Sequence, residues 1–185
     1  WLDLCTEKNF MKKLYIVISY FKSSLILQIL LDRILVFLLF NTKIKITHEY
    51  SYYALASIFK NKKKMSIIDV GANIGTSSLY FLRLKKNCTI HAFEPNRSLL
   101  PNLQKIRKKF LNFKYYNYAL GDKNTKKTFF IPKYKNLYNH YLSSFKKKSL
   151  EKKLIEDFSY SKSKNFTFYK KSIFIKKLDN FNLKP

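Results

Sequence analysis

Residues 66–77 read SIIDVGANIGTS, and this stretch decides the fold. Residues 67–70 are typical of a short buried strand, and residues 76–84 are typical of the amphipathic helix that follows it. The turn between them holds two of the chain's three glycines, Gly71 and Gly75, where average usage would give roughly a dozen in the whole chain. Glycine lets a ligand approach the backbone closely, and a helix start offers unpaired N–H groups. We therefore expect a nucleotide-like ligand at this turn.

The spacing of the glycines separates two ligand classes. A dinucleotide-binding turn has the pattern Gly-x-Gly-x-x-Gly. Asn73 and Thr76 stand where its second and third glycines would be, so this pattern fails and an NAD-dependent enzyme is disfavoured. The turn instead has an acid, Asp69, two residues before its first glycine. A carboxylate beside an open glycine turn suits a ligand with an amino-acid end. The residues expected to bind it are Asp69, Gly71, Ala72, Asn73 and Gly75.

A second strand is expected over residues 88–93, and an acid, Glu94, follows it. A strand, a helix and a second strand at this distance predict a right-handed βαβ unit in a parallel sheet. Glu94 lies 19 residues after Gly75, close to the ~20 residues at which an acid reaches the ribose in such folds. A carboxylate can accept hydrogen bonds from both ribose hydroxyls. The alternative is an acid that only begins the next helix, and we favour the ribose role.

A third strand is expected over residues 113–120, which Gly121 and Asp122 follow. Ligands of parallel sheets bind at the carboxyl ends of the strands. Ala119 and Asp122 are therefore predicted to flank the adenine, although a plain turn explains Asp122 equally well. Further strands are expected over residues 128–131, which Pro132 would end, and over residues 166–178. A helix is expected near residues 150–158.

The composition is that of a folded domain with a very basic charge. Hydrophobic residues make up 46% of the chain, and the formal net charge is +26. Only four of the 37 basic residues are arginine, and Lys, Asn, Ile, Phe and Tyr are all abundant. This pattern favours genome-wide AT bias over a nucleic-acid surface, although an anionic membrane or a phosphorylated glycan stays compatible with the charge. The two cysteines, Cys5 and Cys88, have neither disulfide-framework nor metal spacing, so no metal is expected.

Residues 1–64 are expected to form a helical accessory segment before a catalytic domain over residues 65–185. Residues 14–42 are apolar, but charged residues divide them into runs of at most nine residues. A membrane-spanning helix needs ~20 predominantly apolar residues. We therefore favour helices that pack against the domain in a cytoplasmic protein, and a helix lying in a membrane interface is the alternative. Residues 50–59 are predicted to form another helix.

Together these motifs resemble the FkbM family of S-adenosylmethionine-dependent methyltransferases. The segments that carry the resemblance are residues 68–75, 92–95, 119–122, 142–144 and 175–181. The resemblance implies an α/β, Rossmann-like parallel-sheet methyltransferase fold with S-adenosylmethionine as cofactor. It also implies methylation of a hydroxyl on a sugar or another small acceptor. The family continues with a Lys-Ile-Asp-x-Glu-Gly strand that this sequence lacks, so the fold is expected to be incomplete at its C-terminus.

No catalytic base can be assigned from the sequence. His140 is a candidate because it lies in the segment expected on the substrate side, but a surface histidine among tyrosines is the favoured interpretation. Two other functions remain as alternatives. One is a methyltransferase-fold fragment without activity, and the other is a basic nucleic-acid-binding protein.

Overall fold

The computed structural model describes residues 25–42, 52, 55, 64–85, 87–134, 137–158 and 165–183. Predictions for the remaining residues, including most of the helix expected at 50–59, lie outside this part of the chain; Tyr52 and Leu55 are helical. The elements are α2 (Leu25–Asn41), β1 (Met65–Val70), α4 (Thr76–Leu84), β2 (Cys88–Phe93), η1 (Arg97–Leu99), α5 (Leu100–Lys109), β3 (Phe113–Tyr116), β4 (Ala119–Leu120), β5 (Thr125–Tyr134), β6 (Leu137–Tyr138), α6 (Lys147–Phe158), β7 (Phe166–Lys176) and η2 (Leu178–Asn180).

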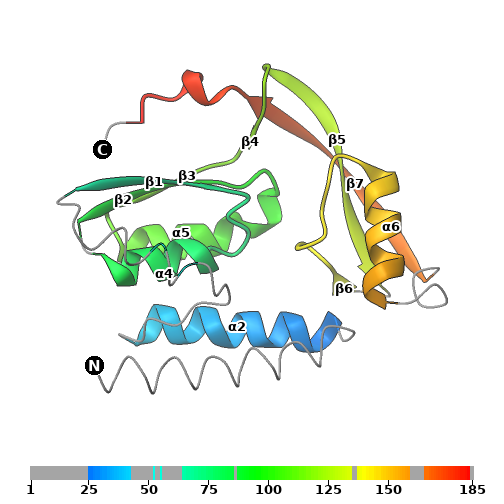
Figure 1. Ribbon diagram of the computed structural model, residues 1–185, viewed down its shortest axis with the longest axis horizontal. Coiled ribbons are helices and arrows are strands. Elements are labelled where there is room, and N and C mark those ends of the chain that lie inside the picture. The colour runs from blue at the N-terminus through cyan, green and yellow to red at the C-terminus, as the bar shows by residue number, and fades with distance from the viewer. Residues whose placement is uncertain are drawn as a thin grey trace.

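The first sheet is parallel, with the order β1-β2-β3, which confirms the predicted βαβ unit. Helices α4 and α5 lie together on one side of it (Figure 1). Their apolar residues Leu79 and Leu103 are fully buried against the central strand residue Ile90. Burial of such a side chain contributes about 1.5–3 kcal/mol. Because all three strands run the same way, their carboxyl ends meet at one edge of the sheet.

Helix α2 packs against α4, on the side away from the sheet (Figure 1). Leu39 is fully buried in this contact. Arg83 of α4 donates to the carbonyl oxygens of Leu39 and Phe40, at 2.7 and 2.8 Å, and so satisfies carbonyls that the end of α2 leaves without a helical partner. This arrangement confirms, for residues 25–41, the prediction of a helix packed against the domain. No helix in the described part of the chain is both long and apolar enough to cross a membrane.

The second sheet has the order β4-β7-β5-β6, and its β5 and β7 form a long antiparallel pair beside α6. One sequence expectation about its start is wrong. Residues 113–120 were expected to form a single strand, but the chain leaves the first sheet after Tyr116 and enters the second at Ala119. The cause is Asn117, whose side-chain amide donates to the carbonyl oxygens of Glu94 and Pro95.

A second expectation also fails, because β5 continues through Pro132 to Tyr134. The carbonyl of Pro132 accepts a hydrogen bond from the backbone N–H of Asn139 at 2.8 Å. The carbonyl of Pro132, and the position where its N–H would be, therefore face β6 and not β7. Its missing N–H costs no hydrogen bond between β5 and β7, and proline is tolerated at such positions.

Candidate functional site

The turn after β1 is held against the end of β2 by the backbone. The N–H groups of Gly71 and Ala72 both donate to the carbonyl of Phe93, at 2.8 and 3.1 Å. Gly71 has a φ of +79°, and a Cβ at this position would meet no atom within 4 Å. Asn73 also has a positive φ, 52°, which asparagine tolerates better than most residues. The turn therefore leaves open space beside its backbone, where a ligand fits.

Gly75 has a different role from Gly71. Its φ is +89°, and a Cβ here would overlap the Ile106 side chain and lie 3.1 Å from Cδ2 of Leu103. Gly75 therefore lets α5 pack closely against the start of α4. Gly71 thus faces open space, whereas Gly75 is required for the packing of the core.

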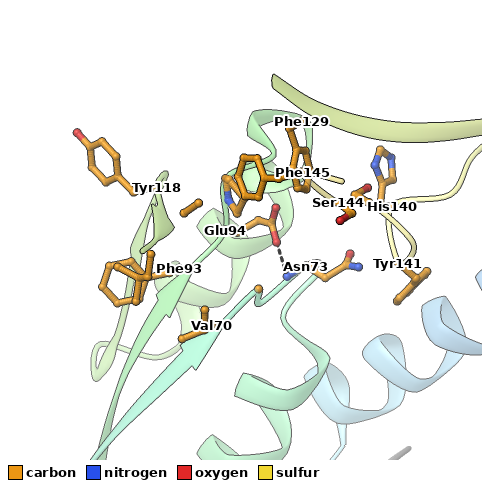
Figure 2. Close-up of a pocket in the computed structure, with 15 residues that line it drawn as sticks. Val70, Asn73, Phe93, Glu94, Tyr118, Phe129, His140, Tyr141, Ser144 and Phe145 are labelled. Atoms are coloured by element: carbon orange, nitrogen blue, oxygen red, sulfur yellow. Dashed lines mark hydrogen bonds between the residues drawn. The ribbon is translucent and has the colours of Figure 1, made fainter. Parts of the chain in front are cut away.

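Glu94 is the buried acid of the site, with 5% of its surface exposed. Its Oε2 accepts the backbone N–H of Asn73 at 2.8 Å, and its Oε1 accepts that of Asn96 at 2.7 Å. Burial raises the pKa of Glu94, the two N–H donors oppose this shift, and the neighbouring Asp69 adds to it. The carboxylate thus joins the first loop to the end of β2, as Figure 2 shows for Asn73.

Asp69 is half-buried on β1, and its Oδ2 accepts a hydrogen bond of 2.6 Å from the Ser78 hydroxyl of α4. It lies level with Ala92 of β2, so the two acids occupy the same edge of the sheet. Asp69 is not among the residues that line the cavity beside the turn. In this structure it connects β1 to α4 and increases the negative potential around Glu94.

A cavity of about 340 Å³ lies over these strand ends, between the two sheets. This volume is at the lower end of the range for small-molecule sites, which is roughly 300–1,000 Å³. Both sheets and the loop after β6 contribute to its wall. The lining residues are Val70, Gly71, Asn73, Phe93, Glu94, Pro95, Tyr118, Ala119, Leu120, Phe129, His140, Tyr141, Ser143, Ser144 and Phe145.

Two polar atoms in the wall of this cavity are buried and have no hydrogen-bond partner among the described residues. They are Oδ1 of Asn73 and Oγ of Ser143. A buried polar group without a partner costs about 1–3 kcal/mol. A polar group of a ligand that reaches these atoms would recover this cost.

The loop of residues 139–145 closes one side of the cavity, and its histidine and tyrosine are both tied to other elements. His140 Nδ1 lies 2.8 Å from the side-chain amide nitrogen of Asn96, and burial together with Lys171 lowers the pKa of His140. Tyr141 hydrogen-bonds the Asp32 carboxylate of α2; burial and this carboxylate raise the pKa of Tyr141. His140 is half-buried and lines the cavity. The expectation of a surface histidine is therefore wrong.

The other predicted site residues are placed as follows. Ala119 is buried and lines the cavity, whereas Asp122 is exposed and does not line it. Ala72 is buried beside the turn. The roles of all of these residues toward a ligand stay predictions. Of the described residues, no group of three or more His, Cys, Asp or Glu side chains could hold a metal.

Sequence reasoning missed the aromatic wall, which consists of Phe93, Tyr118, Phe129, Tyr141 and Phe145. Nothing local in the sequence indicates that residues 141 and 145 return to the strand ends. It also missed Asn96, for which a signal existed. Asn96 precedes a helical turn and accepts the N–H of Ser98 through its side chain, as an N-cap residue does.

Comparison with protein-family models finds a match that covers all of the residues lining the cavity. The model described as the methyltransferase FkbM domain matches residues 69–177, from the acid of β1 to the end of β7. Comparison with curated proteins and with solved structures finds no significant match.

Proposed function

Because this chain belongs to the FkbM methyltransferase family, we propose that it binds S-adenosylmethionine in the cavity over β1 and β2 and methylates a hydroxyl oxygen of its substrate. The acceptor is proposed to be a sugar or another hydroxylated small molecule. The parallel sheet with α4 and α5 would be the first part of a Rossmann-like fold. The observation that carries the proposal is the buried Glu94 carboxylate beside the open glycine turn.

The ribose of the cofactor would bind at Glu94. A carboxylate has about four lone-pair sites, and the backbone N–H groups of Asn73 and Asn96 occupy one on each oxygen. One further site on each oxygen can accept a hydroxyl proton, which suits the two hydroxyl groups of a ribose. The two backbone donors fix the carboxylate, so little side-chain freedom would be lost when the ribose binds.

The remaining parts of the cavity suit the other parts of the cofactor. Gly71 offers backbone without a side chain. Oδ1 of Asn73, which has no partner among the described residues, can accept a hydrogen bond from an ammonium group. Tyr118 and Phe129 line the cavity with flat apolar surface on which an adenine can stack. The arrangement therefore fits a nucleoside with an amino-acid end.

S-adenosylmethionine supplies a methyl group on a sulfonium, which an oxygen nucleophile can displace in line. The task of the chain is to hold the acceptor oxygen in line with that methyl group, and such positioning is worth about 7–11 kcal/mol. Residues of the loop 139–145 and Phe129 of β5 line the cavity around this place.

The direct test of the proposal is isothermal titration calorimetry of the 185-residue chain with S-adenosylmethionine, S-adenosylhomocysteine and NAD⁺. We expect one site for both sulfur nucleosides and no heat of binding for NAD⁺. Incubation with methyl-labelled cofactor and a panel of glycans and alcohols then reads out transfer. Absence of binding by both sulfur nucleosides contradicts the proposal. Binding without transfer to any acceptor favours the alternative of a fragment without activity.

A further inference from the structure

A buried asparagine connects three separate parts of the chain at the rim of the cavity. Asn96 has 1% of its surface exposed and follows β2. Its Oδ1 accepts the backbone N–H of Ser98 at 3.2 Å and the ammonium of Lys171 from β7 at 3.3 Å. Its Nδ2 lies 2.8 Å from Nδ1 of His140. Lys171 is held in turn by the Ser98 hydroxyl, at 2.6 Å.

These contacts determine which way the Asn96 amide faces. A backbone N–H and an ammonium can only donate hydrogen bonds, so the end of the amide that meets Ser98 and Lys171 must be its oxygen. The NH₂ group then faces His140. Since this group can only donate, Nδ1 of His140 must accept, and a proton at Nδ1 would oppose it. The neutral ring of His140 therefore carries its proton on Nε2.

The surroundings of the ring keep it in this neutral form. Burial and the charge of Lys171 lower the pKa of His140. The ring of Tyr138 from β6 stacks on the imidazole, with centroids 5.9 Å apart and planes inclined by 16°. Among the described residues, Lys171 from β7 and Tyr138 from β6 are the titratable groups placed against the ring by these contacts. Nδ1 is bound to Asn96 and one ring face is stacked on Tyr138. None of the described residues hydrogen-bonds Nε2, so this nitrogen stays available for a ligand.

We infer that Asn96 is a positioning residue that holds His140 as the Nε2–H tautomer, and that His140 donates this hydrogen to an acceptor oxygen of the ligand. The oxygen belongs to a group without a proton to lose, such as a carboxylate or a carbonyl. In this tautomer Nε2 carries a proton and Nδ1 accepts from Asn96, so His140 is not the base of the reaction. A hydrogen bond donated to an attacking hydroxyl oxygen would also make that oxygen a weaker nucleophile. Figure 2 places His140 beside Ser144 and away from Tyr118, and the unpartnered Ser143 hydroxyl belongs to the same loop.

The tautomer can be measured without any ligand, and so independently of the proposed function. Nitrogen-15 NMR of histidine-labelled chain separates protonated from unprotonated ring nitrogens, and the spectrum of His140→Phe identifies which of the three histidines is His140. We expect Nδ1 of His140 to be unprotonated, and its pKa to lie below the ordinary histidine value. A proton on Nδ1 in the unaltered chain overturns the inference, whether or not any variant folds.

Variants of the asparagine test its part in this arrangement. In Asn96→Asp the side chain can only accept, so we expect the proton of His140 to move to Nδ1 and its pKa to rise. The matched control is Ser98→Ala, which removes a partner of Lys171 and leaves the Asn96 amide in place; here we expect the Nε2–H tautomer to persist. If Asn96→Asp folds and leaves the tautomer unchanged, Asn96 does not position His140.

The ligand oxygen is identified by comparing two nucleosides; this step rests on the proposed function. S-adenosylhomocysteine has a carboxylate, and 5′-methylthioadenosine does not. If the oxygen is that of the cofactor, His140→Phe should lower the affinity for S-adenosylhomocysteine roughly tenfold. The affinity for methylthioadenosine should stay unchanged. If the oxygen is that of the methyl acceptor, both affinities stay unchanged and the KM of the acceptor rises. An equal loss for both nucleosides, or no change in any of these quantities, overturns the role as donor.

Discussion

Replacement of Glu94 by alanine should reduce the affinity for S-adenosylmethionine by at least about 30-fold, which corresponds to about 2 kcal/mol. The proposed ribose contacts are hydrogen bonds to a charged group, each worth about 1.5–3 kcal/mol. The substitution removes both, and it also releases the N–H groups of Asn73 and Asn96 that shape the turn. Calorimetry with S-adenosylmethionine measures the loss directly.

The effect of Glu94→Ala on stability should be smaller than its effect on binding. Two backbone N–H groups lose their acceptor, which destabilises the fold. Removal of a desolvated carboxylate, whose pKa is raised by burial, offsets part of this cost. Glu151→Ala is the matched control, because Glu151 is a half-exposed acid on α6 that pairs with Lys147. We expect this control to bind as the unaltered chain does. If Glu94→Ala and the unaltered chain bind S-adenosylmethionine with equal affinity, Glu94 does not bind the ribose.

Gly71→Val should abolish cofactor binding in a chain that still folds. Valine is strained at the φ of +79°, at a cost of roughly 1–2 kcal/mol, but its Cβ would have no protein atom within 4 Å. It would instead enter the open space beside the turn. Circular dichroism and denaturant unfolding measure the fold, and calorimetry measures the binding. A Gly71→Val variant with unchanged affinity would show that no ligand approaches the turn at this position.

Gly75→Ala is the informative comparison, because we expect it to lower the stability of the fold, whereas Gly71→Val should mainly affect cofactor binding. Here the new methyl group overlaps Ile106, and both overpacking and a left-handed φ destabilise the fold, by roughly 2–5 kcal/mol together. The second change Ile106→Val removes the atom that is overlapped, so the double variant should recover part of the lost stability. Destabilisation by Gly75→Ala that Ile106→Val leaves unrelieved would contradict this account of the core.

The sequence could predict the turn and Glu94 because both depend on short-range structure. Residues 69–75 form a strand end, a turn and a helix start that are continuous in the chain. Glu94 belongs to the next strand of the same βαβ unit, and the parallel register that places it beside the turn follows from that unit. Local pattern and hydrophobic burial determine all of these features.

The other side of the cavity depends on contacts between distant residues, so the sequence could not reveal it. Asn117 ends the third strand by bonding the carbonyls of Glu94 and Pro95, and this brings Tyr118 to the cavity. The pairing of β5 with β7 joins residues 32 to 50 positions apart, from Tyr134 and Phe166 at one end to Thr125 and Ile175 at the other. No periodicity in the sequence encodes the position of the loop that carries His140.

The central claim is that Glu94 binds the ribose of an adenosyl cofactor. A crystal structure of the 185-residue chain with S-adenosylhomocysteine tests this claim most directly. We predict that both ribose hydroxyls donate to the Glu94 carboxylate, with O···O distances of about 2.5–3.0 Å, and that the nucleoside passes beside Gly71. A nucleoside bound elsewhere, or a ribose without contact to Glu94, would contradict the account.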